Sequence, residues 1–171
     1  AKDNDGHTPF LIACKSNVEL VNFLATRCVD VSDTNNRGYG ALQIAAAHGK
    51  IEVIEFLLGL NVDDEEPLMD INSCDPAGYT PFIVAILAGN EDAALYLLER
   101  GAYPSSFTHD NGRCALHYAA GKSMLRVLEK ILPRRSMGGI DRQDNKGYTP
   151  LALACMAPSP TSVSLLLSLF S

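Results

Sequence analysis

Five near-copies of one eight-residue segment are the feature that most constrains how this chain can fold. GHTPFLIA occupies residues 6–13, GYGALQIA 38–45, GYTPFIVA 78–85, GRCALHYA 112–119 and GYTPLALA 147–154. Their leading glycines, Gly6, Gly38, Gly78, Gly112 and Gly147, are separated by 32, 40, 34 and 35 residues. Self-similarity at this period indicates a repeat architecture, in which each unit packs against its neighbours.

Each copy contains the same signals for a turn followed by a helix. An Asp or Asn, whose short polar side chain can bond nearby backbone N–H groups, stands three positions before four of the glycines. These residues are Asp3, Asn35, Asp75 and Asp144, with His109 at this place in the fourth copy. Thr-Pro follows the glycine in three copies, and threonine caps helices well while proline fits the first helical position. An alanine-rich helix is therefore predicted after each turn.

A second apolar segment follows each alanine-rich one after a short break. The breaks fall at Asn17, Gly49, Gly89 and Ser123. Glycine, and less readily asparagine, fits the left-handed conformation that ends many helices. Segments such as IEVIEFLL (51–58) predict a second helix that is buried on more than one side. Two short helices cannot bury that surface alone, so the copies are expected to stack.

The stretch DPAGYTPFIVAILAGNEDAALYLLERGA (75–102) closely resembles an ankyrin repeat, and GYGALQIAAAHGKIEVIEFLL (38–58) is similar to one. The resemblance covers essentially the whole chain. It implies an all-α ankyrin-repeat solenoid of helix-turn-helix pairs with short β-hairpin or turn tips. We expect one domain over residues 1–171, with repeats at about 3–34, 35–74, 75–108, 109–143 and 144–171. The chain starts at a repeat turn and ends on SVSLLLSLFS, so we expect either an excerpt of a larger protein or a last helix that packs against something else.

Composition excludes several classes of function. The net charge of −6 does not favour nucleic acid binding, and the apolar stretch Leu165–Phe170 is far too short to cross a bilayer. The five cysteines are odd in number and contain no CxxC pair, which argues against a zinc site or a redox motif. Cys14 and Cys155 stand at matching places beside an alanine and are expected to be small buried hydrophobes. Unpaired cysteines indicate a reducing compartment, so we expect an intracellular protein of the cytoplasm or the nucleus.

Two groups of residues suggest chemistry, and a structural role explains each of them better. Cys114 and His117 lie three positions apart and could form a nucleophile and its base, but no orienting group accompanies them. Asp63, Asp64, Glu65 and Glu66 could bind a hard cation, but a solvated acidic loop is the simpler interpretation. We therefore expect no enzymatic activity, no cofactor and no metal.

The resemblance implies a binding surface on the concave face, which turn tips and first helices form. The expected partner-binding residues on this face are Arg37, Tyr39, His48, Tyr79, Leu87, Arg113, Lys122, Lys146 and Tyr148, with Met156 as a further candidate. Tyrosine and arginine are enriched in interface hot spots. With Lys15 added, the cations outnumber Asp5 and Asp110, so we expect a mildly basic groove that binds an acidic protein segment with apolar anchors.

Two alternatives remain open at the level of sequence. The same groove could bind a small anionic ligand, which requires at least two of Arg37, Arg113, Lys122 and Lys146 to converge on one concavity. Otherwise the array could be an intramolecular scaffold or spacer that packs against other parts of its own parent chain.

Overall fold

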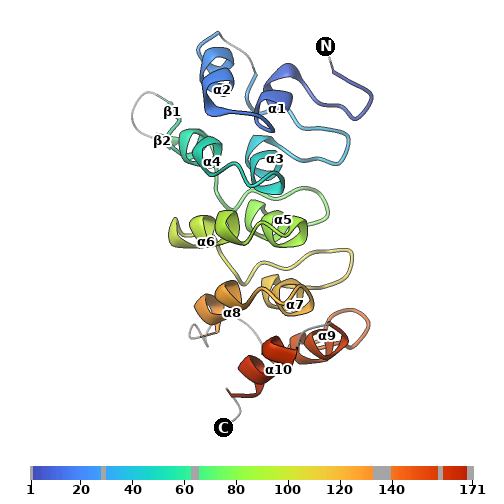
Figure 1. Cartoon of the computed structure of the whole chain (residues 1–171). Coiled ribbons are helices and arrows are strands. Elements are labelled where there is room, and N and C mark those ends of the chain that lie inside the picture. The colour runs from blue at the N-terminus through green and yellow to red at the C-terminus, as the bar shows by residue number, and fades with distance from the viewer. Residues whose placement is uncertain (1, 28–29, 63–65, 133–139, 158–159, 169–171) are drawn as a thin grey trace.

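The computed structural model describes residues 2–27, 30–62, 66–132, 140–157 and 160–168, and these contain ten α-helices in five pairs (Figure 1). The pairs are α1 (Pro9–Ala13) with α2 (Val18–Ala25), α3 (Ala41–Ala47) with α4 (Ile51–Leu58), α5 (Pro81–Ala88) with α6 (Glu91–Glu99), α7 (Ala115–Gly121) with α8 (Leu125–Ile131), and α9 (Pro150–Met156) with α10 (Pro160–Leu167). The predicted all-helical repeat stack is confirmed. One pair lies in each expected repeat, while the boundaries given for the repeats stay predictions.

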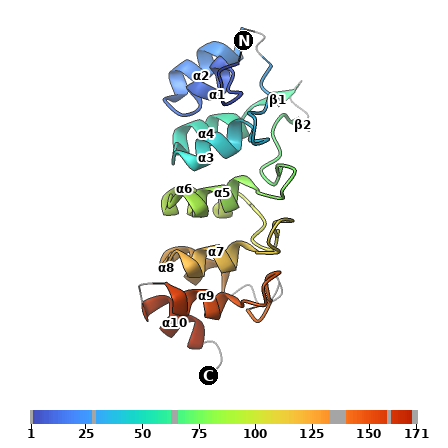
Figure 2. The ribbon, with the colours of Figure 1, turned by 90° about the vertical axis from the view of Figure 1, so that its right-hand side faces the viewer.

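The helices form two columns, with the turns projecting beside one of them (Figures 1 and 2). The first helices pack in the order α1, α3, α5, α7, α9, and the second helices in the order α2, α4, α6, α8, α10. We call the surface of the turns and first helices the first-helix face, and the surface of the second helices the second-helix face. The first-helix face corresponds to the face that the resemblance describes as concave.

The core runs between the columns through the whole stack. Phe10, Phe82, Leu57, Leu97 and Leu128 are fully buried, as are the alanines Ala13, Ala45, Ala85, Ala119 and Ala154. An alanine at each of these places leaves no side chain beyond Cβ, so consecutive first helices approach closely. The large side chains of the core fill the space between first and second helices, because apolar burial is the main stabilising contribution.

Three first helices begin as their sequences predict. The hydroxyls of Thr8, Thr80 and Thr149 accept hydrogen bonds from the backbone N–H of the residue three positions later, at 3.3, 3.3 and 3.2 Å. A proline follows each threonine at the start of the helix. Each threonine thus satisfies one of the N–H groups that a helix start leaves without a partner.

Four of the turn tips are closed by one carboxylate or amide oxygen each, from Asp3, Asn35, Asp75 and Asp144. In the third repeat, Asp75 Oδ1 accepts from the backbone N–H groups of Ala77 and Tyr79 at 3.0 and 2.8 Å. Gly78 has a φ of 86°, and a Cβ atom there would lie 2.9 Å from the carbonyl oxygen of Phe107 in the next turn. Only glycine therefore combines this backbone conformation with such close packing of two tips.

The fourth tip differs because its turn is one residue longer. Thr108, and not His109, occupies the place of the aspartate: its backbone N–H bonds to the carbonyl of Arg113 at 2.9 Å, and its side chain is fully buried with its hydroxyl bonded to Asn111. The only strands among the described residues, β1 (Asn61–Val62) and β2 (Glu66–Pro67), pair antiparallel in the long loop after α4. They do not lie at the turn tips.

Two local expectations are wrong. Asn17 has φ −148° and is extended, because it caps α2 by accepting from the N–H of Leu20 at 2.9 Å and does not end α1 in the left-handed conformation. Cys14 is fully buried, and burial raises the pKa of its thiol to about 12, but Cys155 is exposed. Nothing in the described part of the chain packs on that side of α9.

Several expected features lie outside the described residues. Asp63, Asp64 and Glu65 are among them, as is most of the loop 133–141. No helix in the part of the chain that the structure describes is both long enough and apolar enough to traverse a lipid bilayer.

Candidate functional site

The expected cations of the turn tips lie on the first-helix face and project outward. Arg37 and Lys146 are exposed and stand at matching places, one residue before the turn glycine. Their backbone N–H groups donate to Asn35 Oδ1 and Asp144 Oδ1, at 3.0 and 2.9 Å. The turn therefore anchors the backbone of both residues, while neither side chain forms an ion pair within the described residues.

The three tyrosines that follow the glycines differ in their surroundings. Tyr39 and Tyr79 are half-buried against the core, whereas 38% of Tyr148 is exposed. Burial, and then the nearby carboxylate of Asp75, raise the pKa of Tyr39. Tyr39 and Tyr79 therefore expose only part of their rings to a partner, whereas Tyr148 exposes more of its side chain.

The hydroxyl of Tyr79 is already engaged across two repeats. It donates to Asp110 Oδ2 at 2.7 Å, and its ring centroid lies 6.3 Å from that of Tyr118. Burial and the bond to Asp110 raise the pKa of Tyr79. Burial alone would raise the pKa of Asp110, but the bonds from Tyr79 and from the N–H of Asn111 outweigh it, so that pKa is lowered. Tyr79 and Asp110 thus connect the third and fourth repeats. The lowered pKa keeps Asp110 ionised near neutral pH, so its charge offsets one cation of this face.

Three of the expected residues share one pocket of about 280 Å³. Leu87 comes from α5, Arg113 from the fourth turn tip and Lys122 from the end of α7. The further candidate Met156, on α9, lines the same pocket and is 70% exposed. Three consecutive repeats therefore build this site, which combines an apolar wall with two cationic groups.

Sequence reasoning missed the larger apolar residues Tyr118 and Leu153, which also line this pocket. Both stand six positions after their turn glycine, where Ile44 and Val84 are 3% exposed. Tyr118 and Leu153 are also nearly buried, at 7% and 9%, so their pattern is that of the core. Repeat position alone carries no signal that distinguishes a pocket wall from a core residue.

The two cations of the pocket are not equivalent. Arg113 Nε donates to Asp144 Oδ2 at 2.8 Å, and the Asp144 side chain is only 1% exposed. Lys122 is exposed and has no ion-pair partner among the described residues. Arg37 and Lys146 do not line the pocket. A bound anion would therefore meet one cation without a partner, Lys122, and one that is already neutralised.

His48 and His117 play local structural roles. His48 is exposed at the end of α3, and its Nδ1–H donates to the carbonyl of Ile44 at 2.9 Å. His117 is fully buried, with Nδ1 accepting from the N–H of Cys114 at 3.3 Å and from its thiol at 3.2 Å. Its Nε2–H donates to the carbonyl of Tyr148 at 3.2 Å, and burial lowers its pKa. A neutral His117 thus caps α7 and ties it to the fifth repeat.

Among the residues that the structure describes, a group of potential metal ligands occurs at the first turn tip. The ligand atoms of Asp3, Asp5 and His7 lie within 4.8 Å of one another. The turn itself explains this proximity, because Asp3 Oδ1 accepts from the N–H groups of Asp5 and His7. His7 Nε2 faces the amide of Asn35 at 3.2 Å, and the ammonium of Lys15 lies 3.4 Å from His7 Nδ1. A nearby cation disfavours a metal ion electrostatically.

Two family models match the chain. A model of three ankyrin repeats matches residues 1–66, and a model of a single ankyrin repeat matches residues 77–109. The two matched segments together cover more than half of the chain.

Several curated proteins are similar to the chain over a small part of their own length. The transient receptor potential cation channel subfamily A member 1 of Homo sapiens is 31% identical over 159 residues, which cover 89% of this chain and 14% of that protein. The putative E3 ubiquitin-protein ligase XBAT31 of Arabidopsis thaliana is 29% identical over 75% of this chain and 29% of its own length. Alpha-latrotoxin-Lh1a of Latrodectus hasselti is 29% identical over 73% of this chain and 9% of its own length. The chain spans less than a third of each of these relatives.

Proposed function

The chain belongs to the ankyrin repeat family, and on this premise we propose that it binds a segment of another protein on its first-helix face. Ankyrin repeats are generally protein–protein interaction modules, and domains built from them are non-catalytic. The proposed partner segment carries Asp or Glu beside an apolar anchor. Rigid display of one surface, assembled from several repeats, is the mechanism.

The pocket shared by Leu87, Arg113, Lys122 and Met156 is the observation that carries this proposal. An apolar anchor of the partner would contact Leu87 and Met156, and a carboxylate beside it would face Lys122. Arg37 and Lys146 on the tips extend the positive potential along the same face, and such a field steers an acidic segment toward the pocket.

Two observations favour a peptide over the alternative of a small anionic ligand. The pocket volume of about 280 Å³ is below the roughly 300–1,000 Å³ of typical small-molecule sites. Arg113 and Lys122 do line one concavity, but Arg113 already pairs with Asp144. A phosphate would have to compete with the buried carboxylate of Asp144 for the guanidinium of Arg113. A peptide can instead place one of its own carboxylates against Lys122 and one apolar side chain against the apolar wall.

A binding measurement with a labelled peptide of alternating Glu and Leu tests the proposal. We expect Lys122→Glu to weaken binding about fivefold or more, because a favourable contact becomes a repulsive one. The matched control is Lys130→Glu, which makes the same charge change in the same repeat but on the second-helix face. Raising NaCl from about 0.05 M to about 0.3 M should weaken binding to the unmodified protein, since salt screens exposed charges.

The proposal would be wrong if both variants bound the peptide as the unmodified protein does, or if salt had no effect. Complete absence of binding to the unmodified protein would favour the intramolecular scaffold instead.

A further inference from the structure

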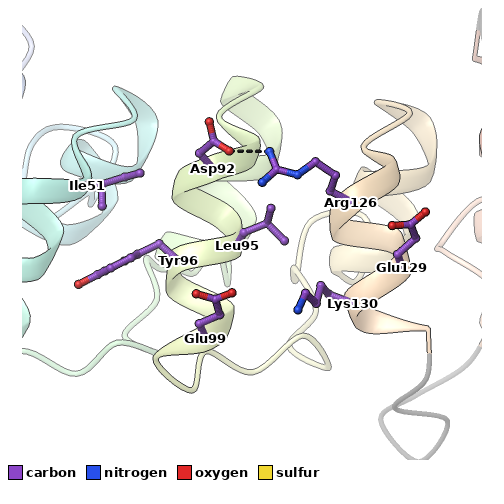
Figure 3. Close-up of a pocket in the computed structure, with 8 residues that line it drawn as sticks. All are labelled: Ile51, Asp92, Leu95, Tyr96, Glu99, Arg126, Glu129 and Lys130. Carbon is purple, nitrogen blue, oxygen red and sulfur yellow. Dashed lines mark hydrogen bonds and ion pairs between the residues drawn. The ribbon is translucent and has the colours of Figure 1, made fainter.

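The second-helix face carries a groove that the proposed function does not use. It lies between α6 and α8, has a volume of about 350 Å³, and continues past Tyr96 toward Ile51 on α4 (Figure 3). Leu95 projects from α6 toward α8 in the middle of this groove (Figure 3). Asp92 and Arg126 lie at one end and Glu99 and Lys130 at the other (Figure 3).

Leu95 is unusual for its place in the repeat. Asn90 immediately precedes α6, and Leu95 lies five positions after Asn90. The matching residues of the first, second and fourth repeats are Asn22, Glu55 and Glu129, all of which are polar and exposed. Stacking of the repeats therefore does not require an apolar residue here, yet Leu95 forms an apolar floor for the groove and is 8% exposed.

The charges around this floor leave an excess of carboxylates. Asp92 already forms an ion pair with Arg126 at 2.6 Å, and Glu55 forms one with Arg100 at 3.0 Å. Neither Glu99 nor Glu129, both of which line the groove, forms an ion pair within the described residues. Lys130 is the only cation of α4, α6 and α8 without such a partner, and these helices also carry the unpaired acids Glu52 and Glu91. The groove therefore combines an apolar floor with a net negative rim.

We propose that this groove is a second interaction surface, which binds a basic segment of a partner protein. An apolar side chain of that segment contacts Leu95, and a neighbouring Lys or Arg pairs with Glu99 or Glu129. The argument is one of charge complementarity, because an apolar floor under unpaired carboxylates matches this chemistry. The two faces of the stack then select partner segments of opposite charge, independently of one another.

A two-dimensional amide NMR titration with two probe peptides tests this proposal and the proposed function separately. A peptide of alternating Lys and Leu should shift the amides of Leu95, Glu99 and Glu129. A peptide of alternating Glu and Leu should shift those of Leu87 and Lys122. If one peptide does not bind, the result with the other peptide is unaffected, so the two proposals are tested independently.

Three variants make the groove assignment specific. Reversing both charges, with Glu99→Lys and Glu129→Lys together, should weaken binding of the Lys–Leu peptide about tenfold or more. Leu95→Asn places the residue of the first repeat at the matching position, and should weaken binding without changing any charge. The control Glu19→Lys reverses an exposed acid of α2, on the same face but outside the groove, and should change the affinity less than about twofold. Preserved amide dispersion in each variant shows that the fold is intact.

Three outcomes would overturn the proposal. In the first, Glu19→Lys weakens binding as much as Glu99→Lys or Glu129→Lys made singly, which would mean attraction to net charge alone. In the second, the Lys–Leu peptide shifts amides elsewhere and leaves those of α6 and α8 unchanged. In the third, the same α6 and α8 amides shift when the protein alone is concentrated, which would assign the groove to a second copy of the chain.

Discussion

At the scale of single residues, Asp144 shows how one carboxylate serves two purposes. Its Oδ1 accepts from the backbone N–H groups of Lys146 and Tyr148, both at 2.9 Å, and so closes the fifth turn. Its Oδ2 accepts from Arg113 of the preceding repeat. In the second repeat, Asn35 closes the same turn through its amide oxygen. Closing the turn therefore needs only an oxygen, whereas the contact with Arg113 also uses the charge.

We predict that Asp144→Asn lowers the free energy of unfolding by about 1 kcal/mol near pH 7, because the turn persists and the ion pair with Arg113 is lost. Burial alone would raise the pKa of Asp144, but the bonds from Arg113, Tyr148 and Lys146 outweigh it and lower that pKa below its ordinary value of 3.8. The stability from the charged form is thus present above pH 3.8 and is lost as the pH falls through the lower, folded-state pKa.

Urea unfolding of both proteins over a range of pH measures this effect. The difference in unfolding free energy should shrink below a pH of about 4. Asp141→Asn, a nearby exposed change with no ion-pair partner among the described residues, is the control and should have little effect at any pH. A difference that did not change with pH would argue against a role for the charge.

At the scale of elements, the first helices begin by two different mechanisms. The Thr80 hydroxyl caps α5 directly, by accepting from the N–H of Ile83. In α7 a cysteine stands at the same place, and the imidazole of His117 accepts from the backbone N–H of Cys114. Both mechanisms satisfy an N–H group at the buried start of a helix, where a missing partner would be costly.

We predict that Thr80→Ala destabilises the protein by about 1 kcal/mol, since the N–H of Ile83 loses its acceptor in a buried place. Thermal or urea unfolding measures the change. The control is Thr26→Ala at the end of α2, where the exposed hydroxyl donates to the carbonyl of Phe23 and water can replace it. An equal loss of stability in both variants would contradict the capping role of Thr80.

At the scale of the whole molecule, the stack is close to one-dimensional, because each helix pair contacts mainly the pair before and the pair after it (Figure 1). The pair of α5 and α6 therefore has a neighbour on each side. The pair of α9 and α10 contacts mainly α7 and α8 among the described elements. A defect in the middle should consequently spread in both directions, and a defect in the fifth pair in one direction only.

We predict that Phe82→Ala, in the middle pair, costs about 3–5 kcal/mol and lowers hydrogen-exchange protection from α3 through α8. Leu166→Ala removes an equally buried side chain from α10, and its loss of protection should stay within α8, α9 and α10. Native-state hydrogen exchange of both variants distinguishes these patterns. The same uniform loss of protection in both proteins would mean that the stack unfolds as a single cooperative unit.

Much of the fold could be predicted because its signals are local and repeated. Thr80 and Pro81 specify a helix start by themselves, and the spacing of the glycines indicates stacking. Predictions were wrong where one residue type fits two local roles. Asn17 can end one helix or cap the next, and which role it takes depends on the length of the connection. Cys155 is exposed because no described element packs on that side of α9, which its own sequence neighbourhood does not reveal.

The sequence by itself determined the repeat, the helix pairs, the turns and the face on which the expected site residues lie, because these follow from backbone propensities and apolar periodicity within one repeat. Only the tertiary structure decided which polar groups stay free on that face. Arg113 meets Asp144 and Tyr79 meets Asp110 across 31 residues of sequence, while Lys122 meets no such partner among the described residues. The groove around Leu95 likewise joins residues of neighbouring repeats. Such contacts depend on which side chains of adjacent repeats meet. The repeat pattern describes only what the repeats share, so it does not reveal these contacts.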